Sequence, residues 1–308
     1  MTSIGILGGG PWGLALARAA RRAGATVTLC TRREHGDKLG GMTVTAELGE
    51  LAQSSRLLLM AVPSNRVRSI ARELGDHLDG AHLLVHGIRG LSGDELAPIS
   101  QILREETPAR RLGALGGPVQ ADELNRGQPS AMVVASEFPD VTRAVRAALN
   151  SKWLQVHGTG DLCGLEWASA MVGCLSIGVG FAQARADVSP GLMAALISRA
   201  VDEAAGIAMA AGASERTFYG LGGYGDLIAS MASPDRPDVV LGRVLAGGAS
   251  LEQAREEARL RVEAIELVPR AMRFARRQGV ACDIFAALEG IITGASQPED
   301  IVSALFAA

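Results

Sequence analysis

Lysine is nearly absent from this sequence of 308 residues, where it occurs only at Lys38 and Lys152. Arginine therefore supplies almost all of the positive charge, a usage typical of a coding bias. Because of this bias, an arginine found where a lysine is expected carries little information by itself. The scarcity still matters for chemistry, because neither lysine lies in the motifs described below.

Closely spaced cysteines and an excess of charge of one sign are also absent. Cys30, Cys163, Cys174 and Cys282 show no close pair and no metal-type spacing, so we expect buried thiols in a reducing cytosol and no metal site. The formal net charge of −3 favours neither nucleic acid nor an anionic membrane surface as a partner. The N-terminus opens directly into an apolar strand, so we expect no signal peptide and predict a cytoplasmic protein.

A long uninterrupted hydrophobic run is missing as well. The most apolar helical stretch, Leu165 to Ala184, is rich in Gly, Ala and Ser and contains Glu166. A membrane span is one interpretation of such a stretch, but its composition favours a buried helix of a globular domain. A chain of 308 residues suits about two domains, each large enough for its own core.

What the sequence does contain is a glycine-rich turn at its start. The apolar run Ile4–Leu7 predicts a buried strand, and strong helix formers follow the turn. The glycines are spaced Gly8-x-Gly10-x-x-Gly13, which allows a tight turn, close approach of the backbone to a pyrophosphate and close packing of helix on strand. A second strand, Ala25–Cys30, follows at the expected distance. We therefore predict dinucleotide binding, with the phosphates at the N-terminus of the helix.

The end of the second strand bears on the choice of cofactor. An NAD-binding protein has Asp or Glu about twenty residues after the turn, whereas this sequence has Arg32 and Arg33, followed by Glu34. Arginines at this place suit a 2′-phosphate, which favours NADP over NAD. An ordinary basic loop edge is the alternative for both arginines, and Glu34 weakens the distinction.

Strands and helices alternate over the first half of the chain. This alternation predicts an α/β fold, a Rossmann-type domain over residues 1–158 with a mostly parallel sheet and helices on both faces. Beyond the first two strands, the expected strands are Leu57–Val62, His82–His86, Leu112–Leu115, Ala131–Ala135 and Leu154–His157. The further expected helices are Met42–Gln53, Asn65–Leu78, Asp94–Glu106 and Asp140–Asn150.

The character of the sequence changes near Gly158. The remaining residues show only helical patterns broken by Gly and Pro, which predicts an all-α domain over residues 159–308, to which the family resemblance given below assigns the substrate and catalytic role. The small residues of Ala200 to Ala213 suit packing against a partner, as in a homodimer, or packing within the domain. The expected helices are Glu166–Arg185, Pro190–Ala211, Leu251–Arg259, Val262–Gln278, Ile284–Gly290 and Pro298–Phe306.

Five stretches stand out as motifs: Gly8–Ala17, Ala61–Arg68, Gly117–Leu124, Gly127–Ser136 and Thr217–Leu227. Together, and in this order, they resemble the bacterial NAD(P)-dependent glycerol-3-phosphate dehydrogenases through nearly the whole chain. The resemblance implies a Rossmann domain joined to a helical domain, and NAD(P) as cofactor. It also implies reduction of dihydroxyacetone phosphate, a phosphorylated triose, to sn-glycerol 3-phosphate for phospholipid synthesis.

The resemblance also assigns roles to single residues. Gly117 corresponds to a substrate contact, and Asp226, in the loop Gly222–Asp226, corresponds to the active-site aspartate. The alternative for Asp226 is a helix N-cap before Leu227. Beside the three glycines of the first turn, the positions that match dinucleotide contacts are Pro11, Trp12, Arg32, Arg33, Ala121 and Glu263.

Two departures from the family concern the chemistry. Ketone reduction needs a proton donor and a cation near the reacting oxygen, and the family has lysines for this at two places. Here those places hold His86 and Val172. Imidazole has an unperturbed pKa of about 6.5, so His86 is a candidate catalytic acid together with Asp226. A strand-end histidine bonded to backbone is the alternative for His86.

A third departure lies after Ser233 and Pro234. The family has Ser-Arg-Asn-Arg here to bind phosphate and cofactor, whereas this chain has Arg236-Pro237-Asp238-Val239. Arg236 is therefore a candidate substrate-binding residue displaced by one position. Three hypotheses follow: an active dehydrogenase, a catalytically impaired NAD(P)-binding paralogue with a sensing or binding role, and a reductase of a different carbonyl or imine substrate.

Overall fold

The structure is a computed structural model that describes residues 2–33, 39–296 and 300, and it divides into two compact units. Unit 1 comprises Met1–Ile88 and Ala97–Glu166, and unit 2 comprises Arg89–Leu96 and Trp167–Ala308. The short segment Arg89–Leu96 thus belongs to unit 2, although unit 1 precedes and follows it in sequence.

Unit 1 contains one eight-stranded sheet. Its strands are β1 (Ser3–Leu7), β2 (Thr26–Cys30), β3 (Thr43–Thr45), β4 (Leu57–Met60), β5 (Leu83–His86), β6 (Arg111–Gly116), β7 (Ser130–Ala135) and β8 (Leu154–Thr159). The strand order is β3-β2-β1-β4-β5-β6-β7-β8, and β6–β7 is the antiparallel pair while the other neighbours run parallel. In the register of β1, Gly5 lies opposite Thr28 of β2 and Leu58 of β4.

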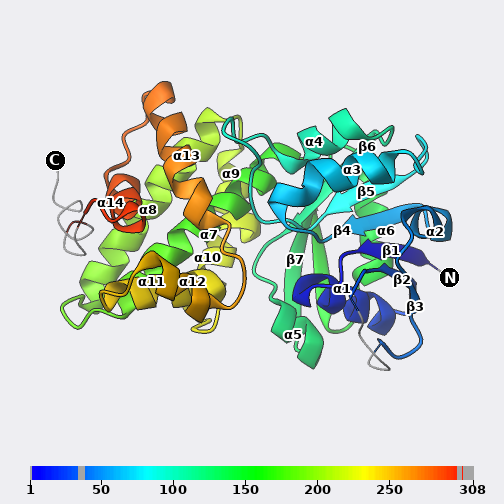
Figure 1. Ribbon diagram of the computed structural model, residues 1–308, viewed down its shortest axis with the longest axis horizontal. Coiled ribbons are helices and arrows are strands. Elements are labelled where there is room, and N and C mark those ends of the chain that lie inside the picture. The colour runs from blue at the N-terminus through cyan, green and yellow to red at the C-terminus, as the bar shows by residue number, and fades with distance from the viewer. Residues whose placement is uncertain (1, 34–38, 297–299, 301–308) are drawn as a thin grey trace. The chain divides into compact units, whose positions relative to one another are not determined.

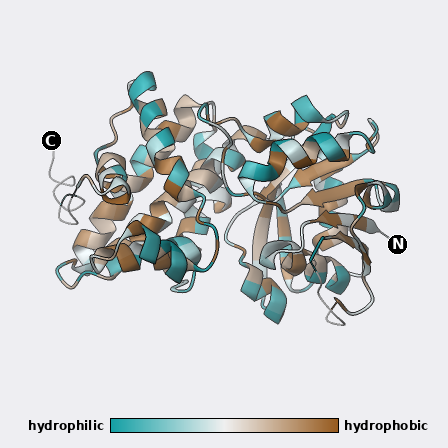
Figure 2. Ribbon diagram, viewed as in Figure 1, coloured by the Kyte–Doolittle hydropathy of each residue, from teal (hydrophilic) through white to brown (hydrophobic). Residues whose placement is uncertain are grey.

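The central strands of unit 1 are apolar because helices cover both faces of the sheet, whereas the edge strands β3 and β8 are partly exposed. Every residue of β4 and β5 is buried, and Figure 2 shows hydrophobic residues gathered on the strands. The helices form two groups, visible around the sheet in Figure 1. One group consists of α1 (Pro11–Arg22), α5 (Ala121–Arg126) and α6 (Pro139–Leu149), and the other of α2 (Leu48–Ser54), α3 (Val67–Gly75) and α4 (Ile99–Glu106). The predicted fold class, a mostly parallel Rossmann-type sheet, is confirmed.

In unit 2 the described residues form helices and turns and no strand. The longer helices are α7 (Leu162–Gln183, its first residues in unit 1), α8 (Pro190–Ala210), α13 (Ala264–Gln278) and α14 (Asp283–Thr293). The shorter ones are α9 (Glu215–Phe218), α10 (Asp226–Met231), α11 (Pro237–Ala246) and α12 (Leu251–Ala258). The prediction of an all-helical second part is confirmed for the described residues.

Helix α7 is the core element of unit 2. Of the helices in the described residues, it is the one long and apolar enough to cross a membrane, but 89% of its most apolar window is buried inside the structure. Trp167 packs on Phe274 of α13 with ring centroids 5.1 Å apart. A Cβ on Gly242 of α11 would overlap the carbonyl oxygen of Ile177, so α11 approaches α7 closely. The sequence prediction of a buried helix here is confirmed.

Several predicted element boundaries are wrong. The helix predicted over Met42–Gln53 is instead a short edge strand, β3, followed by α2 from Leu48. The helix predicted from Asp94 begins only at Ile99, because Pro98 disfavours a helical conformation at the residue before it and Leu96 has a φ of +55°. Helices α5, α9 and α11 were not predicted, and the predicted helix Pro298–Phe306 lies outside the described residues apart from Asp300.

Candidate functional site

The turn between β1 and α1 in unit 1 requires glycine at two of its three glycine positions. Gly8 has a φ of +123°, and a Cβ there would overlap the backbone carbonyl of Ala61, just after β4. A Cβ at Gly13 would overlap the carbonyl oxygen of Gly8. Helix α1 can therefore begin close to the strand only with glycine at both places.

Gly10 is different, because a Cβ at this position would meet nothing within 4 Å. Gly10 is the N-cap of α1, Pro11 follows at the first helical position, and the first turn has no side-chain cap and no acidic residue. The N–H groups and the positive end of the helix dipole are thus not neutralised by α1 itself. A bare backbone beside open space at a helix N-terminus is what a pyrophosphate needs, so these residues fit a dinucleotide.

Trp12 links this turn to the end of β5. The indole Nε1 lies 2.5 Å from the position that a Cβ on Gly87 would take. Trp12 is half-buried and packs against the sheet core. Residue 87 must therefore stay small for the indole to pack there, which explains the glycine after His86 in physical terms.

Four further predicted residues of unit 1 follow strands that run parallel to β1. Arg32 and Arg33 come after β2 and are exposed. Gly117 comes after β6, is buried and has a φ of +96°, and Ala121 begins α5 shortly afterwards. Because the carboxyl ends of parallel strands share one edge of a sheet, these residues lie at the same edge as the glycine turn. Their individual contacts with nucleotide or substrate stay predictions.

Glu263 is the predicted cofactor residue that lies in unit 2. It directly precedes α13 and forms an ion pair with Arg261 at 3.3 Å. The structure therefore does not bring it together with the glycine turn inside one unit, and its role toward a nucleotide stays a prediction.

His86 ends β5 and is 1% exposed. Its Nε2 lies 3.1 Å from Oε1 of Glu166, and the backbone N–H of Ile88 donates to Nδ1 over 3.4 Å. Because a backbone N–H can only donate, Nδ1 is the acceptor and Nε2 carries the hydrogen bonded to Glu166. Both ring nitrogens therefore have partners within unit 1. This arrangement agrees with the structural alternative for His86, while its catalytic role stays a prediction.

Glu166 is the residue that organises this buried cluster. It accepts hydrogen bonds from the backbone N–H of Ser100 at 2.8 Å and from Ser100 Oγ at 2.5 Å, beside the bond to His86. The cluster ties the end of β5 to the start of α4 and to α7. The sequence showed Glu166 only as an interruption of an apolar stretch, and a lone acid in such a helix is the signal that it has buried partners.

The second cluster lies in unit 2 and centres on Asp226. A π-helical turn, Leu221–Gly225, leads directly into α10, and a Cβ on Gly223 would overlap the carbonyl of Phe218. Asp226 is the first residue of α10 and its side chain caps no backbone group, so the N-cap alternative is wrong. The carboxylate is 1% exposed and is held by arginines instead.

Arg89 and Arg236 hold the two oxygens of Asp226. Nη2 of Arg89 lies 2.8 Å from Oδ2, and Nη1 of Arg236 lies 3.1 Å from Oδ1. Arg236 also contacts Ser230 Oγ and lies 3.3 Å from Asp238 through its Nε. Burial raises the pKa of Asp226 to about 6, against the opposing effect of Arg89. Burial likewise raises the pKa of Asp238 to about 6.

Each of these arginines keeps one buried nitrogen without an acceptor among the described residues. These atoms are Nη1 of Arg89 and Nη2 of Arg236. Oδ2 of Asp226 also makes no hydrogen bond, although Nη2 of Arg89 lies 2.8 Å away as an ion-pair partner. A buried guanidinium N–H without an acceptor costs on the order of 1–3 kcal/mol or more. Arg236 was predicted from the sequence, whereas Arg89 was not, because no motif spacing relates residue 89 to residue 226.

Val172, predicted to be a departure from the family, is buried in α7.

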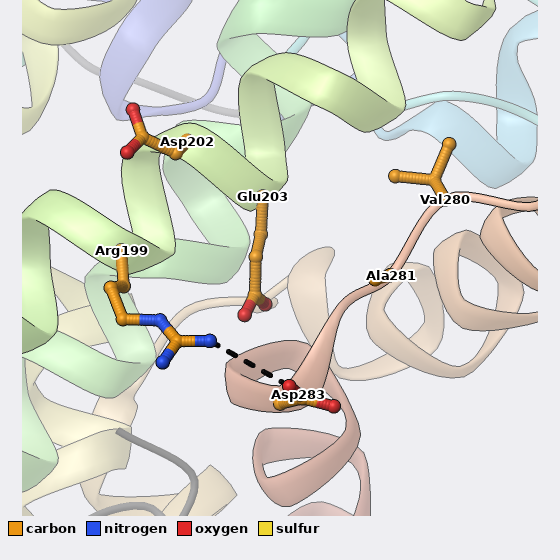
Figure 3. A pocket seen from close by; sticks show the side chains of 6 residues that line it. All are labelled: Arg199, Asp202, Glu203, Val280, Ala281 and Asp283. Carbon is orange, nitrogen blue, oxygen red and sulfur yellow. Dashed lines mark ion pairs between the residues drawn. The ribbon is translucent and has the colours of Figure 1, made fainter. Parts of the chain in front are cut away.

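A separate hollow of about 260 Å³ lies in unit 2 and is drawn in Figure 3. Its most buried acid, Glu203 of α8, accepts hydrogen bonds from the backbone N–H groups of Ile284 and Phe285, each at 3.0 Å. At its rim Arg199 pairs with Asp283 at 3.6 Å. Glu203 thus caps the N-terminus of α14. Among the described residues, no cluster of side chains is suited to a metal ion.

Two family models match the chain. Residues 37–142 match the N-terminal domain of NAD-dependent glycerol-3-phosphate dehydrogenase, and residues 161–303 match the C-terminal domain of the same family. The two matches together cover most of the chain, and they follow the family's own order.

Curated relatives and solved structures are consistent with these matches. A glycerol-3-phosphate dehydrogenase [NAD(P)+] of Lactobacillus delbrueckii subsp. bulgaricus is 28% identical over 99% of this chain and 97% of its own length. One from Salinibacter ruber is 29% identical over 99% and 95%. The crystal structure of glycerol-3-phosphate dehydrogenase from Coxiella burnetii aligns with a TM-score of 0.91 at 20% identity, covering 100% of this chain and 99% of that one.

Proposed function

Because this chain belongs to the NAD-dependent glycerol-3-phosphate dehydrogenase family, we propose that it is an oxidoreductase that reduces dihydroxyacetone phosphate to sn-glycerol 3-phosphate with NADPH or NADH. The family membership extends over both parts of the chain. The single observation that carries the proposal beyond membership is the set of buried polar atoms without a hydrogen-bond partner around Asp226. Two are guanidinium nitrogens and the third is Oδ2 of Asp226, so a substrate with both an anionic oxygen and a hydroxyl group would satisfy them.

The glycine turn of unit 1 would hold the pyrophosphate of the nucleotide. Gly8 and Gly13 shape the turn, and the open backbone at Gly10 would receive the phosphates at the N-terminus of α1. The reduced nicotinamide, when bound, supplies a hydride to the substrate. We further propose NADP as the preferred nucleotide, with Arg32 and Arg33 binding its 2′-phosphate.

The Asp226 cluster of unit 2 would bind the substrate and supply its proton. Arg236 would bind the anionic part of the substrate through Nη2, because its other nitrogens already have partners. Asp226 would be the proton donor, since burial raises its pKa to about 6 and keeps part of it protonated near neutral pH. His86 is the weaker choice for this role, because both of its ring nitrogens are already hydrogen-bonded.

A second candidate is a reductase of another small anionic carbonyl compound. Val172 and His86 stand where the family has lysines, so the substrate site of this chain differs from that of its relatives. Two arginines, Arg89 and Arg236, nonetheless place positive charge beside Asp226. This observation favours turnover of an anionic carbonyl over a nucleotide-binding protein without chemistry.

The test is an assay of the purified chain with dihydroxyacetone phosphate. NADPH and NADH oxidation are followed at 340 nm, and the product is identified as sn-glycerol 3-phosphate by a coupled reaction or by NMR. We expect turnover with saturation in both nucleotide and triose phosphate. Nucleotide binding without turnover of this substrate, with turnover of another anionic ketone, would replace the first candidate by the second. We also propose that the protein is cytosolic. A homodimer is a further proposal, which light scattering of the same sample would test.

A further inference from the structure

Arg89 enters unit 2 from a segment that interrupts unit 1. It lies three residues after His86, and residues Arg89–Leu96 belong to unit 2. The other end of this segment lies beside α13 through exposed ion pairs, where Asp94 lies 3.2 Å from Arg273 and Glu95 lies 3.1 Å from Arg277. Arg89, at the near end of the segment, pairs with the buried Asp226 of the same unit.

The side chain of Arg89 passes beside α7 at the position next to Val172. Its Cδ and Cγ lie 3.6 Å and 3.9 Å from the position that a Cβ on Gly173 would take. Helix α7 contains no Lys, Arg or His over Leu162–Gln183. Arg89 therefore lies at van der Waals distance from α7 at Gly173 and brings to Asp226 a cation that the helix itself does not supply.

Arg89 and Arg236 are held to different degrees. Arg236 is fixed by three groups, Asp226, Asp238 and Ser230, and its side chain is 7% exposed. Arg89 is paired with Asp226 alone among the described residues, and its side chain is 29% exposed. Both arginines keep one buried nitrogen without an acceptor, and Arg89 is the less constrained and the more exposed of the two.

We propose that Arg89 is a catalytic residue whose Nη1 stabilises the negative charge that develops on the carbonyl oxygen of the substrate. The ion pair between Nη2 and Oδ2 of Asp226, at 2.8 Å, places the guanidinium beside Asp226 before the substrate arrives and leaves Nη1 without an acceptor. Preorganised donors of this kind, in a site shielded from water, are among the largest contributions to catalysis. The inference rests on the proposed function and supplies the cation that the chain lacks at residues 86 and 172.

The chemical step balances with Arg89 in this role. A hydride from the reduced nicotinamide nucleotide adds to the carbonyl carbon, and the nucleotide is oxidised. The π electron pair of the C=O bond moves onto oxygen, which takes up the proton of the Asp226 carboxyl and becomes a hydroxyl group. Asp226 then regains a proton from water. Arg89 keeps all of its protons, because guanidinium is not deprotonated in proteins.

The test compares Arg89→Met with a matched control, Arg273→Met. Arg273 is also an arginine of unit 2 that pairs with an aspartate, but its partner is Asp94 at the far end of the same segment and its side chain is 52% exposed. We expect Arg89→Met to lower kcat about 100- to 1000-fold, the usual effect of removing one oxyanion donor, with KM changed less than about threefold. Arg273→Met should keep both constants within about twofold, because exposed ion pairs contribute little.

Chemical rescue separates a catalytic role from a structural one. Arg89→Ala is assayed with added guanidinium chloride and, at equal ionic strength, with sodium chloride. We expect kcat to rise in proportion to guanidinium and not with sodium. An unchanged kcat in Arg89→Met, a loss confined to KM, or no rescue of an Arg89→Ala protein that melts and binds nucleotide normally each overturns the inference. A wild-type chain that reduces no triose phosphate overturns the proposed function and this inference together, whereas an active wild type with an equally active Arg89→Met overturns this inference alone.

Discussion

Asp226 is a residue whose surroundings make its titration a direct test of its role. Its carboxyl is buried and its pKa is raised to about 6, with desolvation as the main cause. Desolvation disfavours the charged form, so the protonated acid persists to higher pH than in an exposed aspartate. Because a proton donor must be protonated to act, the rate of reduction depends on this form.

We predict that kcat for reduction falls as pH rises above about 6, approaching tenfold per pH unit. Asp226→Asn should lower kcat at least about 100-fold and abolish this pH dependence. Asp238→Asn is the matched control, because Asp238 has a similarly raised pKa, opposed by the charge of Arg89, but forms its ion pair with Arg236. It should keep the profile and shift it toward lower pH, since Asp238 contributes to the raised pKa of Asp226. An Asp226→Asn variant with the wild-type profile would exclude this donor.

The contacts of His86 agree with the structural alternative, while its catalytic role stays a prediction. A histidine at the end of a parallel strand is well placed for a ligand, yet here its ring is 1% exposed and bonded to Glu166 and to the backbone. The hydrogen bonds decide the tautomer and leave no ring nitrogen free. The contacts of the individual residues therefore favour Asp226 and Arg89 over His86 for the proposed reduction of the carbonyl group.

At the scale of elements, the glycines of the turn between β1 and α1 differ in whether packing requires them. Gly13 is needed because α1 approaches β1, whereas Gly10 is free of protein neighbours. The two glycines look alike in the sequence, but only Gly13 is required by the packing of the helix on the strand. Gly10 is the glycine that we propose faces the nucleotide. Substitution of each by alanine tests this division.

We predict that Gly10→Ala changes the free energy of unfolding by less than about 1 kcal/mol, the scale of an N-cap substitution. Nucleotide affinity should nevertheless fall at least about tenfold, because the methyl group occupies the place of a phosphate. Gly13→Ala should destabilise the protein by several kcal/mol or prevent folding, as overpacking against backbone does. Denaturant unfolding and nicotinamide fluorescence titration measure the two effects. Equal losses of stability in both variants would contradict the division.

Helix α7 shows how packing against neighbouring helices determines the place of an element in the fold. Its length and hydropathy are compatible with a membrane span, although its composition favours a buried helix, and the packing of α11 and α13 against it shows that it is a core helix. The edge strand β3 shows the reverse case, because a segment of three residues becomes a strand only through its pairing with β2.

At the scale of the whole molecule, nucleotide binding should stabilise the folded chain by mass action. A ligand at one hundred times its Kd stabilises the native state by about 2.7 kcal/mol. We predict that NADPH raises the melting temperature more than NADH at equal concentration, because Arg32 and Arg33 are exposed and available to a 2′-phosphate.

The arginines can be tested by the same thermal-shift measurement. The double variant Arg32→Ala, Arg33→Ala should reduce the effect of NADPH to that of NADH. Arg146→Ala, an exposed arginine on α6 of the same unit, serves as the control and should leave both shifts unchanged. A double variant that still prefers NADPH would show that the second strand does not select the nucleotide.

The sequence by itself determined the Rossmann-type sheet, the helical second part, the nucleotide turn and the family. These features depend on local periodicity and on motifs whose residues are near one another in the chain, and such patterns can be read without coordinates. Asp226 and Arg236 could be named for the same reason, because they lie in or beside recognisable motifs.

Only the tertiary structure decided which charges meet. Arg89 and Asp226 are far apart in sequence, and the pair forms because residues 89–96 leave one unit and pack in the other. The burial that raises the pKa of Asp226 also depends on all the elements around it. The partner of a charge and its exposure to water are properties of three-dimensional packing, so no local pattern in the chain could have identified Arg89.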